Sequence, residues 1–185
     1  LVVVDVQRAG PSTGSPTKTE QGDLWQVLGA SQGDFPKLIL APSNPLDAFQ
    51  TIPEVFNLAD KYQLPAIIVS DLLISDETST IDPKLLDMYP VIDRGEIITE
   101  AGEEAGNYER YKFTDSGISP RALPGIPGYE HVVATDEHMP DGVLISDEFT
   151  HPHKRRAMME KRQSKMDGLL AELAPPAIVG PADAE

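Results

Sequence analysis

The chain has 185 residues, enough for one well-packed core with a small appendage. Its 30 acidic residues against 15 lysines and arginines give a formal charge of -15, which argues against nucleic acid or an anionic membrane as the main partner. It has no cysteine, so this chain by itself can hold neither a disulfide nor a thiolate-bound iron–sulfur cluster.

The chain opens on a short apolar run, residues 1–4, which predicts a strand buried on both faces. Because Leu1 lies inside this run and is no initiator Met, we expect a piece of a longer polypeptide. No apolar run approaches the roughly 20 residues of a membrane helix. No signal-peptide pattern begins the chain either, so a cytoplasmic location is expected.

The loop after this strand, residues 5–20, is where the sequence predicts chemistry. Gly10 and Gly14 permit backbone angles that are closed to residues with a Cβ, and two prolines restrict the loop. Arg8 offers a planar five-donor group suited to a carboxylate or phosphate. Hydroxyl side chains add further hydrogen-bonding groups, at Ser12, Thr13, Thr17 and Thr19.

Two interpretations of this loop remain open on spacing alone. The first is an anion site, in which Arg8, the hydroxyls and backbone amides surround a ligand. The second is a capped turn, since Thr17 and Glu20 have the spacing of a capping box at a helix N-terminus. In either case a helix is expected over 20–30, with Leu24, Val27 and Leu28 on one stripe.

The next segments predict a parallel α/β sheet. Residues 37–41 and 65–69 are short apolar runs of the strand type. Between them, Asn44-Pro45 predicts the start of a helix that runs to Tyr62. Pro53 should kink or split that helix, and Thr51 with Glu54 could cap the second half. In such sheets ligands bind beyond the carboxyl ends of the strands, where the Arg8 loop would lie.

From about residue 81 the sequence is interrupted by proline and glycine, and only short strands are expected, at 96–99 and 131–134. We interpret it as an extended connector that wraps the subunit, because it contains apolar side chains able to pack, at Tyr108, Tyr111, Phe113, Ile118, Leu123 and Tyr129.

Residues 153–173 then predict an amphipathic helix. The residues expected on its apolar side are Met158 or Met159, Met166, Leu169, Leu170 and Leu173. Its basic residues are expected on a solvated face. They are Lys154, Arg155, Arg156, Lys161, Arg162 and Lys165.

Possible metal ligands occur around 136–141 and around 147–153, but neither group has zinc-site spacing, so surface side chains are the favoured interpretation and no metal site is assigned. The residues concerned are Asp136, Glu137, His138 and Asp141, and Asp147, Glu148, His151 and His153.

The loop resembles a known family in its order of residues, Gln7-Arg8-x-Gly10-Pro11-Ser12-Thr13-Gly14-x-Pro16-Thr17-x-x-Glu20-Gln21-x-Asp23. This is similar to the signature of the α subunit of 2-oxoacid:ferredoxin oxidoreductases, especially the 2-oxoglutarate branch. The resemblance continues in order along essentially the whole chain, through Leu40 to Ser43, Phe56 to Tyr62, Tyr111 to Gly125 and Glu137-His138.

The resemblance implies the reaction and the parts. The reaction would be the oxidative decarboxylation of a 2-oxoacid with coenzyme A, which yields acyl-CoA and carbon dioxide and passes electrons to ferredoxin. The substrate would be 2-oxoglutarate in preference to pyruvate. Arg8 and Thr17 match the family's contacts to the substrate carboxylate, and Ser12 and Thr13 lie beside them, while Gly10 and Gly14 shape the loop around the cofactor. No residue of this piece would be catalytic.

The resemblance also implies what this piece lacks. Thiamine diphosphate with magnesium and a 4Fe-4S cluster would be held mainly by the β subunit and by parts outside this sequence. A substrate-contacting Tyr-Pro-Ile-Thr-Pro motif and a glutamate that activates the cofactor would lie upstream. The piece alone should therefore be inactive, and the alternatives are a non-catalytic interaction module or another thiamine-dependent subunit.

The implied fold is α/β, a partial parallel-sheet fold of the thiamine-diphosphate (pyrimidine-domain) type followed by a connector and a helix. The second half of the pyrimidine-binding domain is expected at 1–80, and the connector is expected at 81–152. An amphipathic helix is expected at 153–174, and the entry to a further α/β domain at 175–185.

Overall fold

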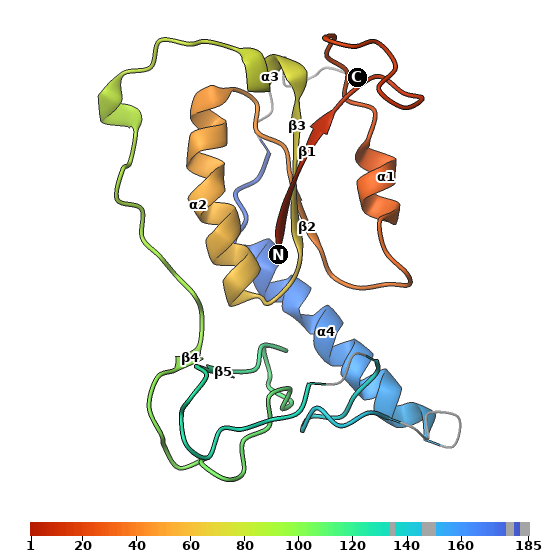
Figure 1. Ribbon diagram of the computed structural model, residues 1–185, viewed down its shortest axis with the longest axis vertical. Coiled ribbons are helices and arrows are strands. Elements are labelled where there is room, and N and C mark those ends of the chain that lie inside the picture. The colour runs from red at the N-terminus through yellow and green to blue at the C-terminus, as the bar shows by residue number, and fades with distance from the viewer. Residues whose placement is uncertain (134–135, 146–150, 177–179, 182–185) are drawn as a thin grey trace.

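The structure is a computed structural model that describes residues 1–133, 136–145, 151–176 and 180–181. At its centre is a parallel sheet in the order β1-β3-β2, with helices α1 and α2 on opposite sides (Figure 1). The parallel α/β arrangement expected from the sequence is thereby confirmed. These elements are β1 (Val2–Gln7), α1 (Leu24–Gly29), β2 (Leu38–Leu40), α2 (Pro45–Lys61) and β3 (Ala66–Asp71).

The first strand is longer and more exposed than its apolar run predicts. β1 pairs with β3 from Val2 opposite Ala66 to Gln7 opposite Asp71. However, the side chains of its valines remain partly in contact with solvent, with Val4 54% exposed. The prediction of a strand buried on both faces is therefore wrong, because β1 lies at the edge of the sheet and little of the described chain covers it.

Helix α2 begins where the sequence predicts and continues past its proline. The side chain of Asn44 accepts a hydrogen bond from the Asp47 amide at 3.0 Å, and Pro45 occupies the first turn. The predicted split at Pro53, with a second cap at Thr51 and Glu54, is wrong because the helix is continuous to Lys61. Burial of the turns after the proline, at Val55, Leu58 and Ala59, offsets the lost backbone bond.

The segment after β3 has little regular structure. It contains α3 (Leu72–Asp76), a short 3-10 helix (Pro83–Leu85), β4 (Ile97–Ile98) and β5 (Arg121–Ala122). The strand expected at 96–99 is β4, which pairs in parallel with β5. No strand forms at 131–133, and residue 134 lies outside the described residues.

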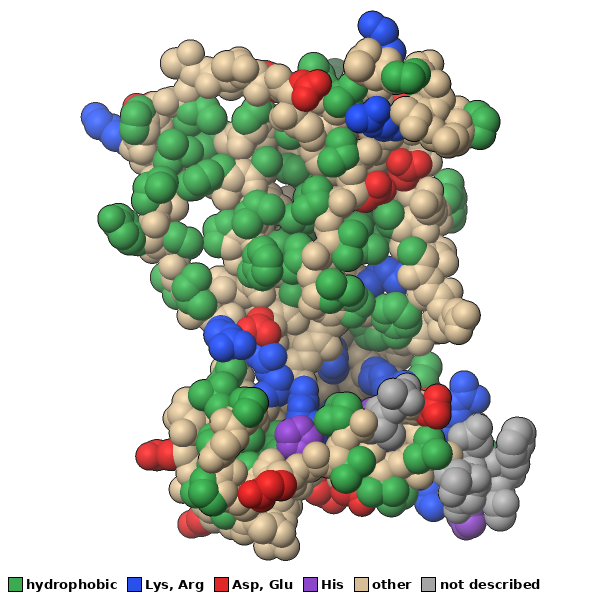
Figure 2. Space-filling model, viewed as in Figure 1, with side chains coloured by type: hydrophobic (Ala, Val, Ile, Leu, Met, Phe, Trp, Pro, Cys, Tyr) green, Lys and Arg blue, Asp and Glu red, His purple; other side chains and the backbone are tan. Residues whose placement is uncertain are grey.

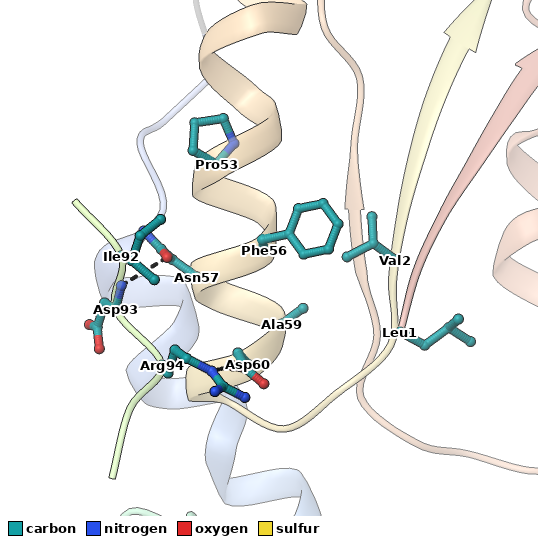
Figure 3. Close-up of a pocket in the computed structure, with 10 residues that line it drawn as sticks. All are labelled: Leu1, Val2, Pro53, Phe56, Asn57, Ala59, Asp60, Ile92, Asp93 and Arg94. Carbon is teal, nitrogen blue, oxygen red and sulfur yellow. Dashed lines mark hydrogen bonds and ion pairs between the residues drawn. The ribbon is translucent and has the colours of Figure 1, made fainter. Parts of the chain in front are cut away.

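Polar contacts fasten this segment to the outer side of α2 (Figure 3). The Asn57 amide donates to the Val91 carbonyl at 2.8 Å, and its oxygen accepts from the Asp93 amide at 2.9 Å. The Asp60 carboxylate accepts from Arg94 Nε at 2.7 Å and from Arg121 Nη1 at 2.8 Å. One turn of α2 thus holds both residues 91–94 and β5.

Below the sheet, the middle of the chain folds around a small aromatic cluster. Tyr108 and Tyr129 are buried, with ring centroids 5.0 Å apart, and Ile118 reaches the main core. Phe113 and Leu123 remain substantially exposed. The wider idea that this segment wraps the complete subunit stays a proposal.

The last helix, α4 (Pro152–Glu172), confirms the helix expected at 153–173 within one residue at each end. Met158 and Leu169 are fully buried, as expected, but Leu170 is 61% exposed. Lys161, expected on a solvated face, is buried because the loop around Gly117 packs against α4 there. Within the described ranges, no helix combines the length and apolar character needed to cross a membrane.

A pair of adjacent leucines on α4 tests this packing. Leu169 is 0% exposed in the core that joins α4 to α2, so Leu169→Ala should lower the free energy of unfolding by about 2–5 kcal/mol. Leu170→Ala on the exposed side should change it by less than about 0.5 kcal/mol. Urea unfolding of the two variants measures this, and equal effects would contradict the described orientation of α4.

The Asp60 contacts predict a pH-dependent stability. Hydrogen bonding to Arg121 is the main reason that the pKa of Asp60 lies below its usual value, despite an opposing effect of burial. Such a carboxylate stabilises the fold above its unfolded pKa of about 3.9, and the contribution is lost as pH falls through the lower folded pKa.

Asp60→Asn should therefore cost about 1 kcal/mol at neutral pH, after allowance for solvent screening, and progressively less below about pH 4. Asp167→Asn, at an exposed site on α4 with no ion pair among the described residues, is the matched control. A cost that stays constant down to strongly acidic pH would show that the charge of Asp60 contributes nothing.

Candidate functional site

The carboxyl ends of β1 and β3 lie at one edge of the sheet, with Gln7 opposite Asp71. The loop from Arg8 to Asp23 extends from this edge (Figure 1). Asp71 also begins α3, since its Oδ1 accepts a hydrogen bond from the Ile74 amide at 2.9 Å. The loop is thus placed where ligands bind in open parallel sheets.

Side-chain hydrogen bonds close the loop onto the two strand ends. Gln7 Oε1 accepts from the Asp23 amide at 3.2 Å, and Asp23 Oδ2 accepts from the Arg8 amide at 3.4 Å. Gln21 Nε2 donates to the second oxygen of Asp71. The pKa of Asp71 is lowered, first by the hydrogen bond from the Ile74 amide and then by hydrogen bonds from the side chains of Gln21 and Thr19. Asp71 is therefore ionised when it holds the loop.

The loop itself consists of two successive turns. The Gly14 amide donates to the Pro11 carbonyl at 3.1 Å, and the Lys18 amide donates to the Ser15 carbonyl at 3.3 Å. The predicted capping box at Thr17 and Glu20 is wrong, because α1 begins only after Asp23. The bonds of Thr19, Gln21 and Asp23 to the strand ends commit these residues to closing the loop, so the helix begins after them.

The backbone of the loop includes strained positions. Ser12 has φ 57° and Thr17 has φ 60°, and each such left-handed residue costs about 1–3 kcal/mol when it is not glycine. Gly14, with φ 59°, is required, since a Cβ there would lie 1.8 Å from the Ala9 carbonyl oxygen. A Cβ at Gly10 would meet nothing within 4 Å, so that glycine has no steric requirement among the described residues.

The groups expected to bind an anion remain available. The Arg8 guanidinium is half-buried, yet only its backbone amide has a hydrogen-bond partner among the described residues. Ser12, Thr13 and Thr17 lie exposed on the two turns, and their hydroxyls likewise have no partner in the described part of the chain. The loop therefore offers one cation and three hydroxyls that are not committed to other contacts among the described residues.

The carboxylates at this edge do not fit a magnesium site. Asp23 and Asp71 are occupied in holding the loop, and burial raises the pKa of Asp5, with a smaller contribution from the charge of Asp23. Across the described residues there is no cluster of three or more His, Asp or Glu side chains that could hold a metal. Asp147 and Glu148, named as possible ligands, lie outside the described residues.

A separate groove lies at the other end of the strands. It has a volume of about 480 Å³ and lies between the start of β1, α2 and residues 92–94 (Figure 3). Its polar groups, Asn57, Asp60, Asp93 and Arg94, hydrogen-bond one another. We therefore assign the candidate site to the loop.

The sequence interpretation missed the residues that hold the loop. Gln7, Gln21 and Asp23 belong to the loop motif, and the sequence places Asp71 with the Arg8 loop at the carboxyl ends of the strands, but it does not predict that these four side chains hold the loop. A detectable signal was present, because hydrogen-bonding side chains directly after buried strands must find partners at the sheet edge.

Comparison with known proteins identifies the family of the chain. Residues 1–161 match the family described as pyruvate flavodoxin/ferredoxin oxidoreductase, thiamine diphosphate-binding. The chain is 37% identical over 168 residues to 2-oxoacid:ferredoxin oxidoreductase 1, subunit alpha, of Sulfurisphaera tokodaii, covering 90% of this chain and 25% of that protein. It is 37% identical over 169 residues to the 2-oxoglutarate oxidoreductase subunit KorA of Mycobacterium tuberculosis, covering 91% and 25%.

A solved structure gives the same result. The 2-oxoglutarate:ferredoxin oxidoreductase from Magnetococcus marinus, with 2-oxoglutarate, coenzyme A and succinyl-CoA bound, matches with a TM-score of 0.77 and 32% identity, over 98% of this chain and 31% of that one. The chain spans about a quarter of the length of the curated relatives it matches. The chain belongs to the pyruvate flavodoxin/ferredoxin oxidoreductase family, within its thiamine diphosphate-binding domain.

Proposed function

We propose that this chain is part of the α subunit of a 2-oxoacid:ferredoxin oxidoreductase and that its loop binds the carboxylate of the 2-oxoacid. The observation that carries this proposal is the Arg8 side chain, a half-buried cation without a partner among the described residues. A guanidinium binds a carboxylate with two parallel hydrogen bonds. The left-handed positions at Ser12 and Thr17 add support, because such strain is typical of functional loops.

In this role the loop orients the substrate. Arg8 would neutralise the charge of the carboxylate and fix its direction, and the hydroxyls of Ser12, Thr13 and Thr17 would donate further hydrogen bonds. Fixing the carboxylate places the neighbouring ketone in one position, which lowers the entropic part of the barrier. No residue of the loop has to transfer a proton in this scheme.

The reaction proposed is oxidative decarboxylation of the 2-oxoacid with coenzyme A to acyl-CoA and carbon dioxide, with the electrons passing to ferredoxin. Thiamine diphosphate, when bound, supplies the electron sink that decarboxylation needs. The described residues offer no ligand set for its magnesium, so we assign the metal, the diphosphate and a 4Fe-4S cluster to the β subunit and to the rest of the assembly. A cytoplasmic location belongs to the same proposal.

The substrate favoured is 2-oxoglutarate over pyruvate. Two of the similar proteins carry 2-oxoglutarate in their names, those of Mycobacterium tuberculosis and Magnetococcus marinus. Steady-state assays of the complete enzyme with both 2-oxoacids, coenzyme A and ferredoxin test this choice. A higher kcat/KM for pyruvate would reject it.

The role of Arg8 predicts a specific loss of substrate use. In the complete enzyme, Arg8→Ala should lower kcat/KM for the 2-oxoacid about 10- to 150-fold, the equivalent of a charge-assisted hydrogen bond of about 1.5–3 kcal/mol. Arg8→Lys should restore only part of it, because an ammonium keeps the charge and loses the planar fork.

Two controls accompany this measurement. Lys18→Ala removes an exposed cation from the same loop and should leave kcat/KM unchanged, and KM for ferredoxin should not respond to either substitution. If Arg8→Ala had full activity, the loop would be only a structural turn and the interaction-module alternative would gain.

Thr17 separates strain from ligand contact. Thr17→Gly removes the hydroxyl, and glycine adopts φ 60° without strain. The relief of backbone strain, about 1–3 kcal/mol, stabilises the folded state, whereas the larger conformational entropy that glycine loses on folding costs about 0.5–1 kcal/mol. Thermal stability should therefore be unchanged or slightly higher, while kcat/KM for the 2-oxoacid falls. Thr17→Ser keeps the hydroxyl and should retain activity, whereas full activity of the glycine variant would exclude a contact from Thr17.

A further inference from the structure

Lys and Arg side chains gather at the narrow waist between the sheet and the lower part of the molecule (Figure 2). Three of them meet at the junction of the end of α2, the 110–119 segment and α4. Arg110 Nη2 donates to Gln63 Oε1 at 2.8 Å, and Lys165 Nζ donates to the Gln63 carbonyl at 3.2 Å. Lys161 Nζ donates to the Gly117 carbonyl at 3.1 Å. We call Arg110, Lys161 and Lys165 the waist cluster.

Gln63 is the centre of this junction. It follows the last turn of α2 with φ 51°, and its Nε2 donates to the Ser119 carbonyl at 2.6 Å. The residue therefore contacts the segment that carries Arg110 and the helix that carries Lys165. Three positive charges from two elements are held together by neutral carbonyl and amide oxygens.

Three neighbouring cations each have a carboxylate partner. Arg162 pairs with Glu137, Arg121 with Asp60, and Lys61 with Glu172 at 2.6 Å. In contrast, no member of the waist cluster forms an ion pair within the described ranges. Arg110 Nη1 is buried and has no acceptor there at all.

The lack of counter-charge is unusual for this chain. It has 30 acidic residues and a formal charge of -15, so carboxylates were abundant for pairing. Lys161 is only 9% exposed, and buried lysines are rare unless paired. Burial, followed by repulsion from neighbouring cations, lowers the pKa of both Lys161 and Lys165 to about 8.

We propose that Arg110, Lys161 and Lys165 form a binding site for a phosphoryl anion at the junction of α2, the 110–119 segment and α4. A phosphoryl group presents up to two negative charges and three acceptor oxygens, which match two ammonium groups and one guanidinium. A carboxylate, with one charge and two oxygens, would leave more of the positive charge uncompensated. Arg110 and Lys165 are partly exposed, so the cluster is reachable from solvent.

The competing explanation is purely structural. Lys165 faces the C-terminal end of α2, where the helix dipole is negative, and Lys161 satisfies the carbonyl of a tightly packed loop. That explanation accounts for one bond on each lysine. The Arg110 guanidinium also lies 5.0 Å from the centroid of the Tyr111 ring. Even so, the structural explanation leaves Arg110 Nη1 without an acceptor and the three charges without a carboxylate among the described residues, and it predicts no anion binding.

Calorimetric titration of the complete assembly with inorganic phosphate tests the proposal at constant ionic strength. Saturable binding is expected, weakened at least tenfold by Arg110→Gln and by Lys165→Gln. Arg156→Gln, which removes an exposed cation from the same helix, should bind phosphate as the unmodified protein does. Two variants on different elements keep the test valid if one of them fails to fold.

A second pair of titrations identifies the source of the phosphoryl group and rests on the proposed function. Coenzyme A and its analogue without the 3′-phosphate are compared in the same variants. Tighter binding of coenzyme A that depends on both the 3′-phosphate and Arg110 would assign the site to that cofactor. Binding of inorganic phosphate alone would assign it to the free anion and would leave the 2-oxoacid assignment to be judged separately by turnover.

The pH dependence distinguishes an anion site from simple packing. Affinity should fall as pH rises above about 8, because the lysines lose their protons while phosphate stays dianionic. Binding near and above that pH should be accompanied by proton uptake, because the bound anion raises the pKa of the lysines. The charged or titratable groups around the cluster are Tyr108, Tyr111, Arg121 with Asp60, and Arg162 with Glu137.

No phosphate or coenzyme A binding in any form, or equal binding by the unmodified protein and the cluster variants, would overturn the proposal. The same holds if affinity does not change between pH 8 and pH 10, where the charge of phosphate is constant. Neither result would bear on the proposed role of Arg8, which is tested separately by the turnover of the 2-oxoacid.

Discussion

The parallel pairing of β1 with β3 is the constraint on which the candidate site depends. It sets Gln7 beside Asp71, and these two side chains receive the bonds that return the loop to the sheet. Because the bonds are made by side chains at strand ends, the loop is closed without a helix of its own. Any ligand-binding role of Arg8 relies on this closure, since the Arg8 amide takes part in it while its guanidinium remains uncommitted.

The loop combines firm attachment with local strain. Left-handed angles at Ser12 and Thr17 are unfavourable for residues with a Cβ, and they persist only where surrounding contacts over-determine the backbone. The ties of Gln21 and Asp23 provide such contacts at one end of the loop, and the crowding of Gly14 against Ala9 provides them in its middle. Both strained positions carry a hydroxyl side chain, although glycine would adopt these angles more easily. This is what the proposed ligand contact would require.

The waist follows a different electrostatic rule from the surface. On the outer side of α2, cations pair with carboxylates, and Asp60 accepts hydrogen bonds from two arginines. Where α4 passes the end of α2, the three cations of the waist cluster are instead held by neutral oxygens. The two arrangements differ in accessibility to water as well as in charge, because Lys161 is removed from solvent by the loop at Gly117. At the junction that joins the sheet to the lower part of the molecule, three positive charges thus lie close together without a carboxylate partner among the described residues.

The sequence by itself determined those features that depend on neighbouring residues. Asn44 and Pro45 start α2, and the alternation of strands and helices requires a parallel sheet with the Arg8 loop at its carboxyl edge. The family followed from the loop motif. The tertiary structure decided the rest. Thr17 does not cap a helix because distant Asp71 binds the segment after it, β1 is exposed because of its place in the sheet, and Lys161 is buried because a loop more than forty residues away packs on it. Each of these depends on contacts between residues far apart in the chain, which local propensity and spacing do not contain.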